Sequence, residues 1–466
     1  MDYQLKTPRQ LIGSAAVAVE LDDRDPIEAL ERYADLPHVC LLHSASPGHP
    51  LSRYSFLAAD PVSVISAQAG AWPSVRARIR ATIRPGRLPF PDLPPLQGGW
   101  MGWLGYELGT AFDHVDRHPC QPVPVHDIAL GMYDWVIAWD HAAGQTWLIS
   151  GGHDATGAAE SLRAKRRAAM AMERWRGAPT VPATTSPVID PASVRADFTA
   201  DSYQRAVGAA IEHVLAGDIF QVNLSQRFSV PFTGAPLALN REVGKRTSAP
   251  MSAYVQHDGV QVISASPERF LRLDPVTRQV ETRPIKGTRP RRDDPEQDAQ
   301  LARELHASNK DRAENVMIVD LMRNDLARVC ERGTVRVPVL NAVESHRTVH
   351  HLVSTVTGVL RADCDAMDLL AATFPGGSIT GAPKLRAMSI IRELEPVARG
   401  VYSGSIGWIG FDGAMDTSIA IRTVIVADGM ATFHAGGGIT VQSDPSDEYQ
   451  ETLDKARALA AAVTAT

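Results

Sequence analysis

The chain has 466 residues, of which 44% are hydrophobic and 21% charged, close to the average for globular proteins. This composition excludes a disordered chain, a fibre and a small disulfide-rich scaffold, and the length allows one large domain or two to three ordinary ones. The formal charge of -6 argues against a nucleic-acid-binding surface. No apolar stretch approaches the roughly 20 residues that span a bilayer. The four cysteines show no metal-binding spacing and the N-terminus shows no signal peptide, so we expect a soluble, cytoplasmic protein that binds neither nucleic acid nor membrane.

Two segments rich in proline and glycine interrupt the first half of the chain, at residues 84–99 and 177–193. The first cannot form a helix or a central strand, because its prolines remove backbone donors. The second follows a basic, alanine-rich helix predicted around residues 158–175. It predicts a linker between an N-terminal region, residues 1–176, and a C-terminal region, residues 194–466.

After this linker the hydrophobic pattern becomes regular. Apolar residues at helical spacing predict a helix that begins at Thr199 or Asp201 and ends at Gly217. Residues 219–225 alternate between apolar and polar, which predicts a strand with one buried face. A long helical stretch is then predicted from residue 296 to residue 330.

The C-terminal part of the chain carries hairpin and helix signals. Asp-Gly pairs at 412–413 and 428–429 lie between β-rich runs and indicate two hairpins. The last element is predicted to be a helix capped by Asp444, with Pro445 in its first turn. Strands joined by hairpins, with helices between them, predict an α+β fold with large antiparallel sheets.

Two of the predicted helices each carry a pair of carboxylates three residues apart, Asp311 with Glu314 and Glu448 with Glu451. Residues at this spacing share one helix face. If the two pairs face each other, they form an oxygen site suited to Mg²⁺. Either pair by itself is more typical of a solvated helix face, and acidic residues also favour a helix N-terminus.

Lys286 lies between Ile285 and the Gly287-Thr288 turn, a placement that can point its amine into a cleft. A buried amine, or one beside other cations, has a lowered pKa and becomes a usable nucleophile. A surface lysine in a loop is the alternative interpretation.

Four further features have open interpretations. The glycine-rich loop 374–384 precedes a predicted helix and could bind an anion, but it lacks the lysine that completes a P-loop. The glycine run 435–438 predicts either close ligand approach or a bulge. Arg422 interrupts an apolar strand, where it faces solvent or binds a carboxylate. His351 is a core or surface histidine when considered alone.

Ten segments between residues 219 and 456 together resemble the chorismate-utilising enzymes, which include anthranilate, aminodeoxychorismate, isochorismate and salicylate synthases. Residues 41–61 and 98–108 resemble the N-terminal region of this family more loosely. The family implies one α+β unit, in which large antiparallel sheets pack as a β-sandwich with helices outside and chorismate in a cleft. The ten segments are IFQVNLSQR (219–227), SASPERF (264–270), RPIKGTRPR (283–291), KDRAENVMIVDLMRNDL (310–326), HHLVS (350–354), FPGGSITGAPK (374–384), YSGSIGW (402–408), AIRT (420–423), HAGGGI (434–439) and DEYQETLDKA (447–456).

The resemblance also implies roles for individual residues. Glu314 and Glu451 are implied to bind Mg²⁺ directly, and Asp311 and Glu448 to assist through water. The groups implied to hold the enolpyruvyl carboxylate of chorismate are Tyr402, Arg422 and the backbone of Gly436 and Gly438. The residues implied to line the ring end are Gly287, Thr288, His351 and Ser378.

Two positions select a branch within the family. Members that add water to chorismate carry a lysine base where this chain has Gln221, and a glutamine cannot deprotonate water. Isochorismate and salicylate formation are therefore not expected. The Pro-Ile-Lys-Gly-Thr motif around Lys286 is similar to that of the members that form 4-amino-4-deoxychorismate for 4-aminobenzoate and folate synthesis. Anthranilate-forming members typically carry alanine at this position and more often a threonine in place of Ser378.

The implied mechanism consists of two displacements. Neutral Lys286 attacks C2 of chorismate while Glu268 donates a proton to the departing 4-hydroxyl group. Ammonia then adds at C4 and expels the lysine. The residues expected to be catalytic are Lys286, Glu268, His351 and Gln221.

No cysteine lies in a glutaminase motif, and no residues remain for a glutaminase domain. The resemblance therefore implies a partner subunit, a glutamine amidotransferase (component II), that supplies ammonia. It also implies a tryptophan pocket, although Leu51 stands where an aromatic residue is common. The alternatives are component I of an anthranilate synthase and a non-catalytic, tryptophan-binding regulatory paralogue. The implied tryptophan contacts are Ser44, Arg53, Tyr54, Pro250 and Met251.

Overall fold

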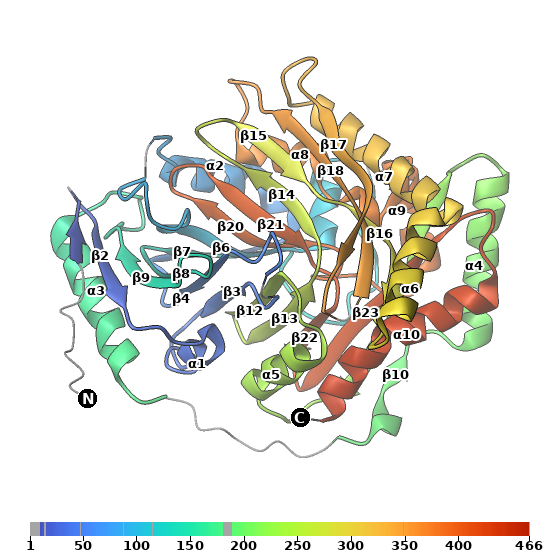
Figure 1. The fold of residues 1–466 in the computed structure, drawn as a ribbon, viewed down its shortest axis with the longest axis horizontal. Coiled ribbons are helices and arrows are strands. Elements are labelled where there is room, and N and C mark those ends of the chain that lie inside the picture. Colours follow the sequence, from blue (N-terminus) through green and yellow to red (C-terminus); the bar gives the residue numbers. More distant parts are fainter. Residues whose placement is uncertain are drawn as a thin grey trace.

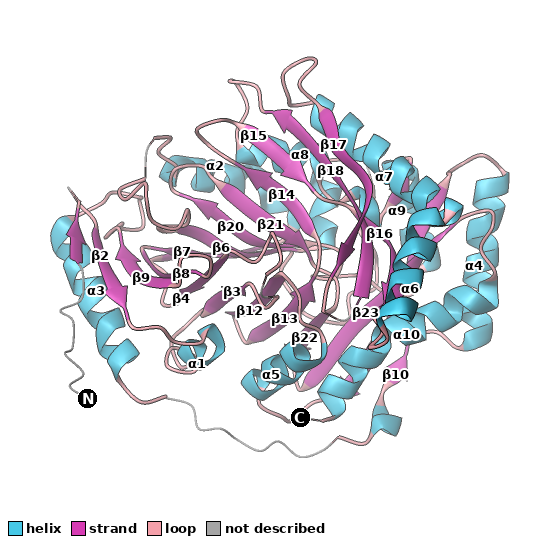
Figure 2. Ribbon diagram, in the orientation of Figure 1, coloured by secondary structure: helices cyan, strands magenta, loops and turns pink. Residues whose placement is uncertain are grey.

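Two large antiparallel sheets form the centre of the computed structural model, which describes residues 10–13, 15–46, 48–86, 88–113, 115–179, 189–347 and 349–465. Helices lie around the sheets (Figure 1, Figure 2). This arrangement confirms the predicted α+β fold.

The first sheet has 13 strands among the described residues. Twelve of them follow one path, and the last one below pairs with β11. In spatial order they are β1 (Gln10–Ile12), β2 (Val17–Leu21), β9 (Gln145–Ser150), β8 (Trp135–Asp140), β4 (Tyr54–Ala58), β3 (Cys40–His43), β12 (Met251–His257), β13 (Val260–Ser266), β22 (Thr423–Ala427), β23 (Met430–Ile439), β11 (Gln221–Pro231), β10 (Arg195–Ala196) and β19 (Gly381–Ala382).

The second sheet has 10 strands among the described residues, the last one below pairing with β18. In spatial order they are β16 (Ile285–Pro290), β18 (Val349–Val359), β15 (Gln279–Thr282), β14 (Arg269–Leu273), β21 (Met415–Ile419), β20 (Ser405–Gly410), β6 (Gly99–Leu104), β7 (Ile128–Tyr133), β5 (Ser63–Ala67) and β17 (Arg336–Ser345).

Strands of the N-terminal and C-terminal regions pair directly in both sheets. In the first sheet β3 pairs with β12, and in the second β6 pairs with β20, where Trp103 lies opposite Ile406. Between the sheets, buried side chains of both regions form one apolar cluster that includes Trp103, Ile406 and Trp408. Of the predicted linker, residues 180–188 lie outside the described residues.

The helices cover the outer faces of the sheets, most of them around the C-terminal region (Figure 1). None of the helices in the described ranges has the length and apolar composition that crossing a membrane requires. They are α1 (Pro26–Leu30), α2 (Trp72–Thr82), α3 (Ser161–Arg176), α4 (Ala200–Leu215), α5 (Pro236–Arg246), α6 (Pro295–Ala307), α7 (Asn309–Ala327), α8 (Ala366–Thr373), α9 (Lys384–Leu394) and α10 (Pro445–Thr464).

The helix caps and Asp-Gly turns predicted from the sequence are confirmed. Helix α4 begins after Thr199, whose side chain accepts a hydrogen bond from the Ser202 amide. Helix α10 begins after Asp444, which caps two backbone N–H groups. The two Asp-Gly pairs lie in the turns between β20 and β21 and between β22 and β23.

The prediction of one long helix over residues 296–330 is wrong. The structure has two helices, α6 and α7, which are separated at Ser308. Ser308 has an extended backbone (φ -64°, ψ 109°), and its side chain accepts a hydrogen bond from the Asp311 amide. A side-chain cap therefore starts a second helix although the apolar spacing continues. The new start orients α7 independently of α6.

Candidate active site

A hydrogen-bonded chain of three residues joins Lys286, Ser378 and Glu268. The Lys286 Nζ atom donates to the carbonyl oxygen of Ser378 at 2.8 Å, and the Ser378 hydroxyl donates to Glu268 Oε1 at 2.6 Å. Lys286 lies on β16, where a bulge interrupts the pairing with β18 between Lys286 and Thr288. Gly287 takes the positive φ of 76° that this bulge requires. The structure thus brings three of the predicted residues into contact.

The two ionisable groups of this chain are shifted in complementary directions. Burial lowers the pKa of Lys286, while the nearby carboxylates of Glu314 and Glu268 act in the opposite direction. Burial raises the pKa of Glu268 to about 7, against the hydrogen bond from Ser378 and the charge of Lys286. The shift of Lys286 favours the neutral amine that a nucleophile requires, and a pKa of about 7 lets Glu268 carry the proton of a general acid.

Three carboxylates meet over the glycine run of β23. A Cβ atom added at Gly437 would lie 2.8 Å from Glu448 Oε2 and 3.5 Å from Glu451 Oε1. One added at Gly438 would lie 3.6 Å from Glu314 Oε2 and 2.0 Å from the side-chain nitrogen of Gln221. The pairing of β23 with β11 is continuous through these residues. The glycines therefore allow a close approach of side chains and do not form a bulge.

The charges of these carboxylates interact. Burial raises the pKa of Glu314, and the neighbouring Glu448 adds to this shift. Burial also raises the pKa of Glu448, and Glu451 adds to it. The pKa of Glu451 is lowered despite burial, because the Lys455 ammonium lies 2.6 Å from Oε1. The three carboxylates thus lie close together at a site that is buried at Glu448 and open to solvent at Glu451, an arrangement that a bound cation would stabilise.

Nearby basic side chains contact the same acids. Lys310 Nζ lies 3.7 Å from Glu448 Oε1, and Arg289 lies 3.1 Å from Asp311 Oδ2. Asp311 thus lies beside β16, where a Cβ at Gly287 would come within 2.9 Å of its side chain. In the described part of the chain, the four predicted acids do not form a group of three with all ligand atoms within 4.8 Å of one another. Glu314, Glu448 and Glu451 nevertheless offer only oxygen donors, the set that Mg²⁺ prefers.

Arg422 corrects a prediction. It lies outside a strand, in the connection between β21 and β22, with a positive φ of 51°. Its side chain is partly buried, and within the described residues its guanidinium has no hydrogen bond or ion pair. Burial lowers the pKa of Arg422. The guanidinium is thus free to bind an anionic ligand.

The other residues predicted to hold the enolpyruvyl carboxylate lie on neighbouring elements. Tyr402 is buried, and its ring stacks on that of His434 with centroids 4.8 Å apart and planes 7° from parallel. Gly436 lies on β23 opposite Ser225, and its carbonyl oxygen accepts a hydrogen bond from Lys455 Nζ at 2.8 Å.

Two polar side chains of this region each have one buried atom without a hydrogen-bond partner among the described residues. His351 Nδ1 lies 2.9 Å from the Thr288 hydroxyl, but its Nε2 atom is buried with no partner among the described residues. The Oε1 atom of Gln221 is likewise buried without a hydrogen-bond partner among the described residues. Burial lowers the pKa of His351 well below its usual value, with a contribution from Arg422. His351 is therefore a buried, neutral histidine of the site.

Sequence reasoning missed two buried cations that support the site. Arg399 donates to the carbonyl oxygens of Asn223 and Ile379, both at 2.7 Å, and pairs with Glu395. It therefore connects the strand of Gln221 to the loop of Ser378. Lys384, which ends the glycine-rich loop, is buried, and its Nζ atom lies 2.6 Å from Asp325 Oδ2. Only the spacing of Glu395 and Arg399, four residues apart, gave a signal in the sequence.

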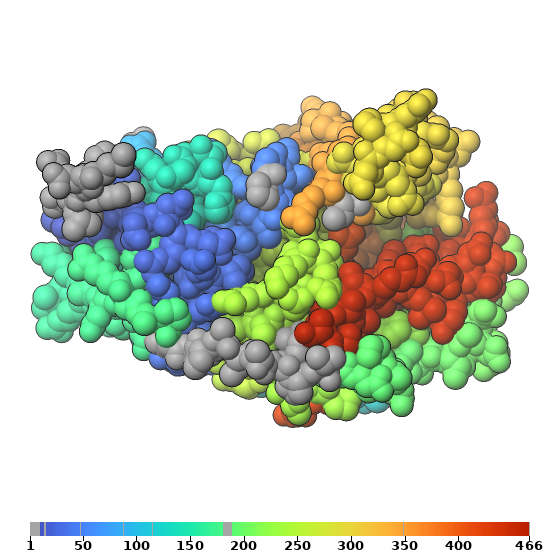
Figure 3. All heavy atoms as spheres, turned by 60° about the horizontal axis from the view of Figure 1, so that its bottom comes forward, coloured from blue at the N-terminus to red at the C-terminus, as the bar shows by residue number. Residues whose placement is uncertain are grey.

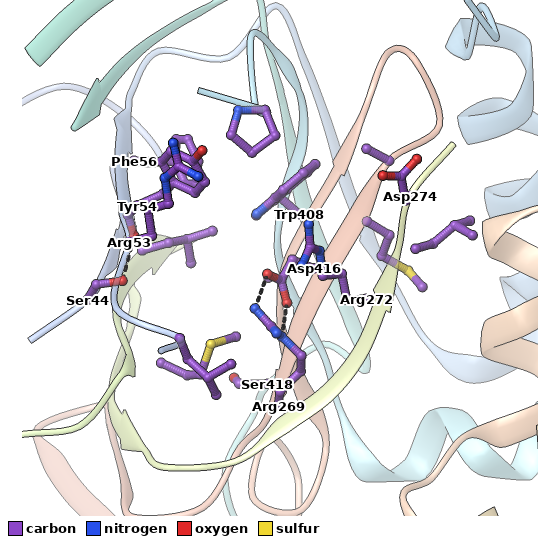
Figure 4. Close-up of a pocket in the computed structure, with 18 of the residues that line it drawn as sticks. Ser44, Arg53, Tyr54, Phe56, Arg269, Arg272, Asp274, Trp408, Asp416 and Ser418 are labelled. Atoms are coloured by element: carbon purple, nitrogen blue, oxygen red, sulfur yellow. Dashed lines mark hydrogen bonds and ion pairs between the residues drawn. The ribbon is translucent and has the colours of Figure 1, made fainter. Parts of the chain in front are cut away.

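A cavity of about 630 Å³ lies apart from these residues, between the N-terminal strands and the second sheet (Figure 4). All five residues predicted for a tryptophan pocket line it, as does Leu51. On its opposite wall Arg269 and Asp416 form an ion pair at 2.9 Å (Figure 4).

Comparisons with known proteins identify relatives of this chain. The model of the chorismate binding enzyme family matches residues 37–461. Aminodeoxychorismate synthase component 1 of Salmonella typhimurium is 42% identical over 90% of this chain and 92% of its own length. Anthranilate synthase component 1 of Streptomyces coelicolor is 40% identical over 91% of this chain and 83% of its own length. The crystal structure of anthranilate synthase component I from Streptococcus pneumoniae has a TM-score of 0.79 at 31% identity, covering 89% of this chain and 93% of the other.

Proposed function

This chain belongs to the chorismate binding enzyme family, and on that premise we propose that it converts chorismate and ammonia to 4-amino-4-deoxychorismate. The observation that carries the proposal is the placement of Lys286, whose amine is buried and hydrogen-bonded in a chain with Ser378 and Glu268. The similarity to aminodeoxychorismate synthase component 1 supports the same reaction. The product would serve the synthesis of 4-aminobenzoate and folate.

In the first step the neutral Nζ atom of Lys286 forms a bond to C2 of chorismate. The two conjugated double bonds of the ring shift, the bond from C4 to the hydroxyl oxygen breaks, and Glu268 protonates that oxygen so that water leaves. The resulting carboxylate of Glu268 then accepts the surplus proton of the alkylated amine. The pKa of about 7 allows Glu268 to act in both directions.

In the second step ammonia attacks C4, the two ring double bonds shift back, and the bond between C2 and Lys286 breaks. The amine leaves with the proton that ammonia loses. Two displacements therefore put nitrogen at C4, para to the ring carboxylate, whereas direct attack by ammonia at C2 gives the ortho product.

The substrate carries two carboxylates, which we propose are bound at two places. Arg422, which has no partner in the described chain, and Tyr402 would hold the enolpyruvyl carboxylate with the backbone of Gly436 and Gly438. His351 Nε2 and Gln221 Oε1, both unpartnered among the described residues, would orient the 4-hydroxyl group that leaves.

Glu314, Glu448 and Glu451 fit a Mg²⁺ ion by their donor atoms and their shared position over Gly437 and Gly438. The ion would supply positive charge that binds the ring carboxylate and stabilises the charge that develops as the hydroxyl leaves. Asp311 would assist through water. Lys310 contacts Glu448, and Lys455 contacts Glu451.

We further propose that a glutamine amidotransferase subunit supplies the ammonia, as the names of the relatives as component 1 suggest. The purified chain should then use ammonium chloride but not glutamine. The 630 Å³ cavity would bind tryptophan.

The central test compares the wild-type chain with Lys286→Ala, supplied with chorismate, Mg²⁺ and ammonium chloride. Intact-mass analysis of the quenched wild type should show an adduct equal to chorismate minus water. The variant should lack it and form product at least about 10³-fold more slowly. Lys245→Ala, which changes a surface lysine paired with Glu242, is the control and should behave as wild type.

Chromatography of the product separates the alternatives. Anthranilate instead of 4-amino-4-deoxychorismate would assign the chain to the ortho branch. An unlabelled wild type together with normal amination by Lys286→Ala would refute the covalent mechanism.

A further inference from the structure

The N-terminal segment 98–108 contributes a buried acid, Glu107, to the neighbourhood of the candidate active site. Glu107 lies in a 3₁₀ helix (Tyr106–Ala111) directly after β6 and is 4% exposed. Its Oε1 atom accepts a hydrogen bond from the Arg399 amide at 3.0 Å, and its Oε2 atom accepts one from the Gly400 amide at 2.9 Å. Both oxygens of this carboxylate thus bind consecutive backbone N–H groups of the C-terminal region. Neither the proposed reaction nor the comparisons assign a role to this contact.

The backbones of the two regions approach each other closely at this contact. The Tyr106 amide donates to the Gly400 carbonyl oxygen at 2.7 Å. A Cβ atom added at Gly105 would lie 3.0 Å from that same oxygen, and one added at Gly404 would lie 2.2 Å from the Leu104 carbonyl oxygen. A side chain at Gly404 would therefore push the two segments apart. The glycines let the segments lie directly against each other, which brings the carboxylate within reach of the two amides.

Arg399 connects this contact to the candidate active site. Its guanidinium donates to the carbonyl oxygens of Asn223 on β11 and of Ile379 in the glycine-rich loop. Its own carbonyl oxygen accepts a hydrogen bond from the Tyr402 amide at 3.2 Å. Glu107 therefore holds the backbone of a residue whose side chain and carbonyl group contact three parts of the site.

The turn that carries Tyr402 has an unusual backbone conformation. Gly400 and Ser403, on either side of Tyr402, have positive φ angles of 61° and 62°. Such a conformation is costly for a residue with a side chain, so that of Ser403 persists only where the surrounding contacts fix it. At the end of the turn, the Ser403 amide donates to the Ala420 carbonyl oxygen at 2.8 Å. At its start, the turn is fixed by the two hydrogen bonds to Glu107.

We propose that Glu107 is a positioning residue for chorismate binding, because its carboxylate holds the turn that places Tyr402 beside the enolpyruvyl carboxylate. This inference rests on the proposed function, in which Tyr402 and Arg422 hold that carboxylate. The two hydrogen bonds of Glu107 go to backbone groups and not to the reacting side chains. Loss of Glu107 should therefore weaken substrate binding more than it slows the chemical steps. The N-terminal region would thereby take part in substrate binding.

The test compares the wild-type chain with Glu107→Gln. The glutamine has the same shape, but its NH₂ group faces one of the backbone N–H groups and cannot accept a hydrogen bond from it. With Mg²⁺ and ammonium chloride, the KM for chorismate should rise at least about threefold while kcat stays within about twofold of wild type. A purely structural role would lower the fraction of folded protein, which reduces the apparent kcat and leaves KM unchanged. Burial raises the pKa of Glu107 to about 7, so the assay is run at pH 8, where the wild-type carboxylate is ionised.

Asp127→Asn is the matched control. Asp127 is 3% exposed, and its carboxylate accepts hydrogen bonds from the Ala69 amide and from Arg117, both in the N-terminal region. This variant should lower the thermal midpoint, because a buried hydrogen-bonded charge is lost, but it should keep the KM of wild type. Glu107→Asp keeps the charge and both acceptor oxygens at a greater distance from the amides, so its KM should lie between those of wild type and Glu107→Gln.

Arg422→Ala separates failure of this inference from failure of the proposed function. It removes a cation from the proposed carboxylate site itself, so the KM for chorismate should rise at least about tenfold. An unchanged KM in Arg422→Ala would overturn the proposed carboxylate site and the inference with it. A raised KM in Arg422→Ala together with an unchanged KM in Glu107→Gln would overturn the positioning role alone.

An equal rise of KM in Asp127→Asn would also overturn the positioning role, because it would show a general effect of buried charge. If Glu107→Gln gives no folded protein, Glu107→Asp decides the question. A KM raised in that variant supports the positioning role, and an unchanged one contradicts it.

Discussion

The candidate active site and the 630 Å³ cavity are built on the same sheets, but their polar groups are arranged differently. In the candidate active site, His351 Nε2 and Gln221 Oε1 are buried without partners within the described residues. In the cavity wall, Arg269 pairs with Asp416 and Glu281, and Arg53 pairs with Asp140. A buried polar group without a partner is costly, so its presence indicates a ligand that satisfies it. The comparison favours an anionic ligand for the candidate active site and a ligand without net charge for the cavity.

One strand separates the two sites. Glu268 and Arg269 are neighbours where β14 begins, and successive side chains of an extended strand point to opposite faces. Glu268 accepts a hydrogen bond from Ser378 in the candidate active site, while Arg269 lines the cavity. Substitutions on either side of this strand can therefore test the two sites separately.

The largest expected effect on activity is that of Glu268→Gln in the candidate active site. The amide cannot donate the proton that the leaving hydroxyl needs, so kcat should fall about 10²–10⁴-fold. The wild-type kcat should fall as the pH rises through about 7, because the carboxyl group loses its proton there. The variant should lack this pH dependence. Glu281→Gln, which removes a partner of Arg269, should keep it, and a shared profile would contradict the role of Glu268.

The next largest effect concerns the three carboxylates over Gly437 and Gly438. Glu451→Gln removes one of three anionic oxygen donors, so the Mg²⁺ concentration for half-maximal activity should rise at least about tenfold. Titration of activity with Mg²⁺ measures this. Asp454→Asn is the control on the same helix, where Asp454 pairs with Arg457. Equal shifts in the two variants would show that Glu451 acts only through the general charge of the helix.

A smaller effect on activity is expected from filling the cavity. Met251→Trp places a large ring in the cavity, so the binding of free tryptophan should be lost while the ammonia-dependent kcat stays within about twofold of wild type. Calorimetry with tryptophan measures the first and product formation the second. The tryptophan assignment fails if the wild type releases no heat of binding or if the variant binds equally well.

The smallest effect is expected at the rim of the cavity. Arg53 is 57% exposed, pairs with Asp140 and lies 4.8 Å from the centre of the Tyr54 ring. Exposed contacts of this kind contribute little, so Arg53→Met should lower the free energy of unfolding by less than about 1 kcal/mol. Urea unfolding checks this value. A larger loss would show that the rim supports the fold as well as the cavity.

Short-range signals in the sequence predicted the elements well, because caps and turns act over three or four residues. Thr199 and Asp444 cap helices as expected. The break at Ser308 was missed because apolar spacing was given more weight than the Ser-x-x-Asp pattern of a cap. Arg422 was placed in a strand because nothing in its apolar surroundings indicates a positive φ.

The candidate site was predicted mainly from its resemblance to a family, and its long-range contacts had no signal in the sequence. The pairs of carboxylates on α7 and α10 were visible, but their meeting over Gly437 and Gly438 depends on how two helices pack. The contact between Lys384 and Asp325 joins residues 59 positions apart. Such contacts follow from the fold and not from local spacing.

The pairing of β6 with β20 has a consequence for how the chain acquires its structure. Gly99–Leu104 bond to Ser405–Gly410, and these segments are separated by some three hundred residues of chain. Contacts between such remote segments slow folding. During synthesis the edge of β6 and its apolar surface cannot be covered by β20 until β20 has been translated. We therefore expect this protein to depend on chaperones during translation, and its separated halves to aggregate when expressed alone.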